Sequence, residues 1–104
     1  METSNLSIST SDVKFLYNDL VEKVDDSGKL GNHYIEDGIM VIEVGDKRNY
    51  ICGEYDTNSG EGAVTINGRT MWNDVLNYPY FEGFPLWYIV LTTAIRGVFG
   101  DDSL

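Results

Sequence analysis

The first part of the chain carries apolar residues at the spacing of an amphipathic helix. Ser9, Thr10 and Ser11 offer N-cap oxygens, and Ser27-Gly28 ends the pattern. Residues three and four apart line one face of a helix. The pattern therefore predicts a helix from about residue 11 to about residue 25. Its apolar face consists of Val13, Leu16, Tyr17, Leu20 and Val24.

From Gly38 onward the apolar period changes to that of short strands. Residues 39–44 and 49–55 are β-branched or aromatic runs joined by GDKR, which is typical of a hairpin. Residues 56–62 (DTNSGEG) have the composition of a loop, and a third short strand covers residues 63–66. The sequence thus predicts a three-stranded antiparallel meander.

The remainder of the chain favours helices. Asn67-Gly68 would suit a tight turn into a fourth strand, but Thr70 followed by apolar residues fits a short capped helix better. The last apolar run starts at Pro85, which suits the first position of a helix. Its β-branched residues favour a strand, whereas its length and its proline favour a helix, and we predict a helix.

These elements predict a single domain of the α+β class over residues 1–104. An N-terminal amphipathic helix and C-terminal helical segments would pack with the three-stranded meander, the C-terminal segments on one face of the sheet. A chain of 104 residues has the usual length of one domain. We expect residues 1–10 to be a mobile leader and residues 101–104 a mobile tail.

The chain is strongly acidic. Seventeen Asp and Glu residues against seven Lys and Arg give a formal net charge of -10. This charge repels phosphate backbones, so direct binding of nucleic acid is disfavoured. It also attracts basic protein surfaces and speeds encounter with them. The alternative is that the acidity serves solubility alone.

The sequence lacks motifs for catalysis and for metal binding. His33, which we expect in an exposed loop, and Cys52 are the single residues of their kinds, and no P-loop or G-x-S-x-G elbow occurs. Residues 56–62 match the first and third positions of a calcium loop, but the fifth, sixth and twelfth positions fail. We expect no enzyme activity, no cofactor and no metal. A pair of carboxylates that catalyses hydrolysis is the alternative.

Targeting signals are also lacking in the sequence. The first residues have neither the basic nor the apolar region of a signal peptide. The longest apolar stretch, residues 86–95, is interrupted by Thr92 and Thr93 and is too short to cross a bilayer. A lone cysteine suits a reducing compartment. We expect a cytoplasmic protein that does not enter a membrane.

Two segments are candidates for a partner-binding surface. One is a second stripe on the predicted helix, opposite the apolar one, in which carboxylates surround an outward phenylalanine. Like charges at this spacing destabilise a helix, so the stripe suits contact with a basic partner. The other is the tyrosine-rich segment 78–85, because such irregular segments make rigid contacts. The alternatives are an ordinary solvated helix face and rings that fold over the core. The selected residues are Asp12, Phe15, Asp19, Glu22 and Asp26 on the helix, and Tyr78, Tyr80 and Phe81 in the segment.

The leading functional hypothesis is a small acidic protein that binds and blocks a basic partner protein, as an inhibitor or as an immunity or anti-defence factor. A nucleic-acid-processing enzyme would be a natural target, with carboxylates standing in for phosphates. A second hypothesis is a small-ligand or catalytic domain with a pocket near His33, Glu36 and Asp37, rimmed by the tyrosines. A third is a self-associating subunit in which the aromatic loop forms a homodimer interface.

Overall fold

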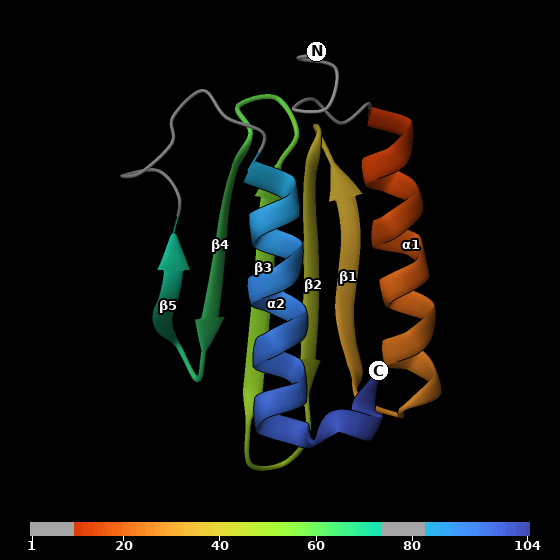
Figure 1. The fold of residues 1–104 in the computed structure, drawn as a ribbon, viewed down its shortest axis with the longest axis vertical. Helices are drawn as coiled ribbons and strands as arrows, with labels where there is room; N and C mark the ends of the chain where they lie inside the picture. Colours follow the sequence, from red (N-terminus) through yellow and green to blue (C-terminus); the bar gives the residue numbers. More distant parts are fainter. Residues whose placement is uncertain (1–9, 74–82) are drawn as a thin grey trace.

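The computed structural model describes residues 10–73 and 83–104 (Figure 1). Within these residues the chain forms two α-helices, five β-strands and a short 3-10 helix, which confirms the predicted α+β class. In chain order the elements are α1 (Thr10–Asp26), β1 (Leu30–Glu36), β2 (Ile39–Gly45), β3 (Tyr50–Asp56), β4 (Glu61–Ile66), β5 (Arg69–Asn73), α2 (Gly83–Phe99) and η2 (Asp101–Ser103).

The strands form a meander in which each strand pairs antiparallel with the next along the chain. The register places Ile42 opposite Gly53, and Gly53 opposite Val64. Successive residues of a strand point to opposite faces of the sheet. One face, called the covered face below, therefore carries Met40, Ile42, Val44, Ile51, Gly53, Tyr55, Gly62, Val64 and Ile66.

The helices α1 and α2 both pack on the covered face. Figure 1 shows α2 in front of β3, with β4 to its left, and α1 beside β1; α2 contacts β3 and β4, and α1 contacts β1 and β2. Each helix buries one stripe of apolar residues at three-and-four spacing, so burial of apolar area joins the two layers. The buried residues are Val13, Tyr17, Leu20 and Val24 of α1, and Trp87, Leu91 and Ile95 of α2. Two of the three predicted helices are present with somewhat different ends: α1 was predicted at 11–25, and α2 was predicted to start at Pro85 but starts at Gly83.

Two glycines allow α2 to approach the sheet closely. A Cβ atom on Gly62 would lie 2.7 Å from Cδ1 of Trp87, and one on Gly53 would lie 2.9 Å from Cδ2 of Leu91. The indole Nε1 of Trp87 donates a hydrogen bond to the carbonyl oxygen of Ala63 at 3.1 Å. The covered face is therefore flattened where the largest side chain of α2 rests on it.

Tyr17 joins α1 to the first two strands. Its hydroxyl donates to the carbonyl oxygens of Val41 and, at 3.2 Å, of Tyr34. The side chain is almost completely buried, and this burial raises the pKa of Tyr17 to about 12. The hydroxyl consequently stays protonated and keeps its role as a donor at physiological pH.

Two tight turns explain why the sheet has more strands than the sequence predicted. Asp37 (φ 54°) and Gly38 (φ 82°) join β1 to β2, while Asn67 (φ 52°) and Gly68 (φ 84°) join β4 to β5. Positive φ at both central residues defines a two-residue hairpin turn of type I′. The prediction of a three-stranded meander is therefore wrong, because the described sheet has five strands.

Two strands, β1 and β5, were missed by sequence analysis for different reasons. The short helix predicted from Thr70 is instead β5, because the Asn67-Gly68 turn returns the chain along β4 and pairing with that strand overrides the helical pattern. His33 lies on β1, not in a loop. β1 is an edge strand and most of its residues are exposed, so its sequence lacks the apolar alternation by which a strand is recognised.

Candidate functional site

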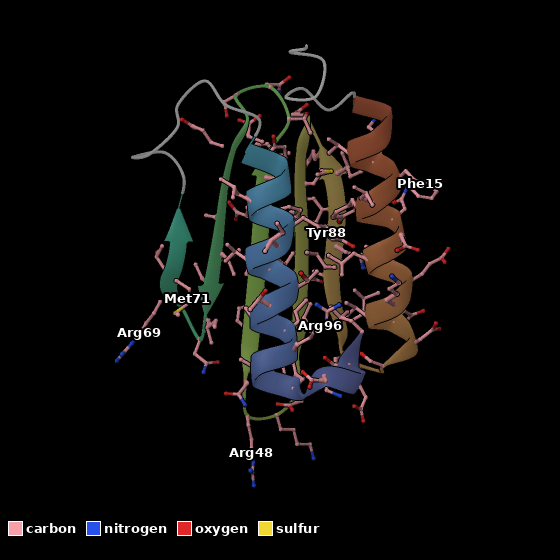
Figure 2. The ribbon with its side chains drawn as sticks, in the orientation of Figure 1. Phe15, Arg48, Arg69, Met71, Tyr88 and Arg96 are labelled. Carbon is pink, nitrogen blue, oxygen red and sulfur yellow. The ribbon has the colours of Figure 1, made fainter. Side chains whose placement is uncertain are left out.

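The outer face of α1 carries the acidic stripe that the sequence predicted. Phe15 is 70% exposed, and Figure 2 shows it on the side of α1 that is turned away from α2. Glu22 and Asp26 are exposed on the same helix. An exposed phenylalanine adds little to folding, so its position among carboxylates is more useful to a partner than to the core. The side chain of Asp12 lies outside the described part of the structure.

Lysine side chains reduce the negative charge of this stripe. Nζ of Lys23 lies 3.1 Å from Oδ2 of Asp19, one helical turn away, and both side chains are partly exposed to water. The hydrogen bond and the charge of Asp19 raise the pKa of Lys23. Lys14 is also exposed on α1. Asp19, one turn from Phe15, is thus already paired, and Glu22 and Asp26 lie on the same face about two and three turns from Phe15.

The second predicted group, Tyr78, Tyr80 and Phe81, lies outside the described residues. Its place relative to the stripe on α1 stays a prediction.

The structure also places exposed side chains together on the sheet face opposite the helices, called the open face below. No helix or strand within residues 10–73 and 83–104 packs on it. Tyr34 is 49% exposed and Tyr50 is 41% exposed, so two aromatic rings reach solvent there. The register assigns to this face Tyr34, Glu36, Ile39, Val41, Glu43, Tyr50, Cys52, Glu54, Asp56, Glu61, Ala63 and Thr65.

The charged residues of the open face all have the same sign. Five of these twelve residues are carboxylates and none is a lysine or an arginine. Glu43 lies opposite Cys52, and Glu54 is the next outward residue along β3. Asp56 lies directly opposite Glu61. Like charges at such cross-strand positions are destabilising, so folding by itself does not favour this arrangement.

The negative charge changes the acidity of the groups between the carboxylates. Burial raises the pKa of Tyr50 to about 12, aided by a hydrogen bond with Glu43. Burial also raises the pKa of Cys52, and the charges of Glu54 and Glu43 add to the effect. At neutral pH Cys52 is therefore a thiol, which disfavours a role as a nucleophile. Tyr50 keeps its proton and can donate a hydrogen bond.

Two of the five carboxylates serve the turn between β3 and β4. Oδ1 of Asp56 accepts from the backbone N–H groups of Asn58 at 2.8 Å and Ser59 at 3.4 Å. Oε1 of Glu61 accepts a hydrogen bond from Oγ of Ser59 at 3.4 Å. Thr57 Oγ1 donates to the Gly38 carbonyl oxygen at 2.6 Å. The loop that resembles part of a calcium site thus uses its oxygens internally, and the described residues hold no cluster of three or more potential ligands.

Two cavities lie away from His33. The larger, about 450 Å³, is called the α2 groove and is lined by Ile66, Met71, Ile89, Val90, Thr93 and Ala94. A hollow of about 190 Å³ lies between the C-terminal end of α1 and η2 and includes Lys23, Asp26 and Asp102. His33 lines neither of them; it is exposed on β1, with Nδ1 3.2 Å from the Gly31 carbonyl oxygen. A pocket beside His33 therefore has no support from these cavities.

Comparisons of the chain with protein-family models, with curated proteins and with solved structures gave no match. None of the described helices is both long enough and apolar enough to cross a membrane.

Sequence reasoning missed the open face as a surface. The usable signal was the alternation in β3, where Tyr50, Cys52 and Glu54 take turns with the buried Ile51 and Tyr55. The remaining members of the open face come from β1, β2 and β4, and only the pairing of the strands brings them together.

Proposed function

We propose that this chain acts by binding a basic partner protein, as an inhibitor or as an immunity or anti-defence factor. One observation carries the proposal: the exposed rings of Phe15, Tyr34 and Tyr50 each lie on a surface rich in carboxylates. Rings that served only the core would be buried, and charges that served only solubility would not need rings beside them.

Carboxylates and rings have different roles in such binding. The net charge of -10 creates a long-range field that accelerates encounter with a positively charged protein. Exposed ion pairs contribute little affinity because water and salt screen them. Aromatic rings contribute desolvated contact area, which slows dissociation. A surface with both features binds a basic protein quickly and also holds it.

A nucleic-acid-processing enzyme is the target class that fits best. Such an enzyme presents lysine and arginine residues to phosphate groups. Glu43 and Glu54 are diagonal neighbours on adjacent strands, which places their Cα atoms about 7–8 Å apart. Carboxylates at regular spacing can therefore occupy a groove that normally holds a nucleic-acid backbone. The single cysteine, Cys52, suits the cytoplasm, where such enzymes work.

The test is affinity capture with the full chain immobilised at low ionic strength, followed by a salt gradient and mass spectrometry. We expect the retained proteins to be basic, with isoelectric points above about 9, and to elute as the salt concentration rises. A matched column carries a variant with Glu22, Asp26, Glu43 and Glu54 replaced by lysine, and it should retain none of them. Equal retention on both columns would refute the proposed function.

A second candidate function, self-association, is favoured by the α2 groove. α2 and β5 contain no Asp or Glu, so two copies of this acidic chain meet there with the least repulsion. Met71 (59% exposed) and Ile89 (58% exposed) stand at the groove, and Figure 2 shows Met71 on β5. Each could fill the groove of a second copy. Light scattering at two protein concentrations should show a dimer that Ile89→Glu abolishes, and a monomer at both concentrations would exclude this function.

A further inference from the structure

We infer that the open face is the surface on which the basic partner docks, and that it takes a segment of the partner rich in arginine. This inference rests on the proposed function and assigns its site. The site differs from the stripe on α1 that the sequence indicated, so the two surfaces can be tested against each other.

The first step is that the open face exposes large apolar and aromatic side chains as well as polar ones. Antiparallel sheets often expose one face, and such a face usually carries polar side chains. Here Ile39 is also exposed and is a diagonal neighbour of Tyr34, whereas Tyr50 lies toward the other end of the face, opposite Gly45, and Val41 of the middle strand is buried. Large apolar side chains that stay exposed on a sheet face on which none of the described helices packs indicate a surface that another molecule covers.

The second step is the sign of the charge. A face that met only water would gain from cross-strand pairs of opposite charge. The open face instead has carboxylates on each of β1, β2, β3 and β4, and none of its residues is basic. Glu36, Glu43 and Glu54 have no part in the turn that Asp56 and Glu61 stabilise. Charge complementarity therefore requires a positively charged occupant.

The third step identifies the side chain that fits. Val41 of β2 lies opposite Tyr34 of β1 on one side and opposite Glu54 of β3 on the other. Two strand spacings separate Tyr34 from Glu54, which is about 10 Å between their backbones. A planar guanidinium that bridges these two residues across the buried Val41 can stack on the tyrosine ring and form two hydrogen bonds with the carboxylate. Lysine offers a single ammonium and loses the stacking, so arginine is preferred.

Other occupants fit less well. A second copy of the chain would bring the same carboxylates face to face, and nucleic acid or an anionic membrane surface would be repelled in the same way. The stripe on α1 is the weaker surface because Lys14 and Lys23 lie among its acidic residues. The partner is therefore a protein segment with several arginines.

The experiment uses acetylated nonaarginine and nonalysine peptides as probes of the full chain. Isothermal titration gives affinity at low salt, and two-dimensional amide NMR maps the contact. We expect nonaarginine to bind more tightly than nonalysine and to shift the amides of Tyr34, Val41 and Glu54 most. Tyr34→Leu should remove the preference for arginine while it leaves nonalysine binding nearly unchanged.

Three variants that each remove two negative charges distinguish the surfaces. E43Q/E54Q changes the open face, E22Q/D26N changes α1, and D101N/D102N changes η2 as the control. We expect E43Q/E54Q to weaken nonaarginine binding by about tenfold and each of the others by less than about twofold. Circular dichroism checks that each variant is folded.

The other outcomes contradict either the docking site or the proposed function. Largest shifts and losses on α1 would refute the open face as the docking site and leave the proposed function standing on α1. Equal losses in the three variants would refute a localised docking site. Failure of the wild-type chain to bind either peptide at low salt would refute the proposed function itself.

Discussion

The two faces of the sheet are made from alternate residues of the same strands, and they obey different constraints. In β3, Ile51, Gly53 and Tyr55 are buried under the helices, whereas Tyr50 and Glu54, which alternate with them, are exposed. Alternate residues of a strand thus belong to two separate surfaces, one on each face of the sheet. Packing against α1 and α2 constrains the residue types on one face. On the other face, binding to a partner can constrain them.

On the covered face the volume of each side chain is constrained, and on the open face the sign of the side-chain charges is constrained. Gly53 and Gly62 have no space for a side chain because Leu91 and Trp87 fill it. On the open face the side chains vary in size and the charges share one sign. Changes on the covered face should therefore alter the free energy of unfolding, and changes on the open face should alter binding. Five predictions test this division, beginning with the largest expected effect.

Replacing Trp87 by alanine should cause the largest loss of stability. Its side chain is completely buried, and its ring centroid lies 5.6 Å from that of Tyr55. Its indole N–H also donates a hydrogen bond to the carbonyl oxygen of Ala63. We expect Trp87→Ala to lower the free energy of unfolding by about 3–5 kcal/mol in urea denaturation. Ile89→Ala, two residues along α2, should change it by less than about 0.5 kcal/mol because Ile89 faces solvent. Similar losses in the two variants would mean that α2 packs by another face.

Gly62→Ala tests the close approach of α2 to the sheet. The added Cβ would lie 2.7 Å from Trp87, so the helix must shift, and we expect a loss of about 1–3 kcal/mol in urea denaturation. Gly97→Ala is the matched control because nothing lies within 4 Å of its added Cβ. Within a helix this change should stabilise the protein by about 0.5–1 kcal/mol. The two glycine substitutions should therefore have opposite signs.

Charge reversal on the open face should affect binding and not stability. We expect E43K/E54K to lower the association rate with a basic partner about tenfold in stopped-flow measurements, and to flatten its dependence on salt. The free energy of unfolding should change by less than about 0.5 kcal/mol. D19K/E22K on α1 should lower the rate less, because Asp19 is already paired with Lys23. A larger effect from the helix variant would reverse the ranking of the two surfaces.

Tyr17 should make stability depend on alkaline pH. Its folded-state pKa of about 12 exceeds the ordinary value of 10.0, so the unfolded chain releases the proton first. The contribution of Tyr17 is therefore complete below pH 10 and is lost as the pH rises from 10 to 12. We expect Tyr17→Phe to be less stable than the wild type by about 1 kcal/mol at pH 8, with a gap that narrows above pH 10.

The measurement for Tyr17 is urea denaturation at pH 8, 9 and 11. Tyr50→Phe is the control, since Tyr50 also has a raised pKa but lies exposed on the open face. Tyr50→Phe should change the decrease in the free energy of unfolding between pH 8 and pH 11 less than Tyr17→Phe does. A gap between Tyr17→Phe and the wild type that stays constant with pH would show that the Tyr17 hydroxyl does not couple its proton to folding.

Phe15→Ser should have the smallest effect on folding. The ring is 70% exposed, so the loss of stability should be below about 0.5 kcal/mol by thermal denaturation. Retention of a basic partner should fall if α1 supplies a second contact. A loss above about 1 kcal/mol would instead show that the ring packs on the chain, which is the ordinary interpretation of an apolar residue on a helix.

The parts of the fold that were predictable are those with a local signal. The three-and-four spacing of Val13, Leu20 and their neighbours gave α1, and the β-branched runs around Met40 and Ile51 gave β2 and β3. β1 and β5 could not be found in the same way. β1 is an exposed edge strand without apolar alternation, and the residues of β5 fit an amphipathic helix equally well until β4 is available as a partner.

The candidate site shows the same division. The sequence by itself determined the net charge and the stripe on α1 that contains Phe15, because a helical wheel is a local property, whereas the exposure of Phe15 came from the structure. Only the tertiary structure decided that Tyr34, Val41 and Glu54 share one surface, since they come from three strands and meet through long-range pairing. It also decided which sheet face α1 and α2 cover, and therefore which face none of the described helices covers. The physical reason is that helix periodicity depends on neighbours in sequence, whereas a sheet surface depends on register between segments that are distant in sequence.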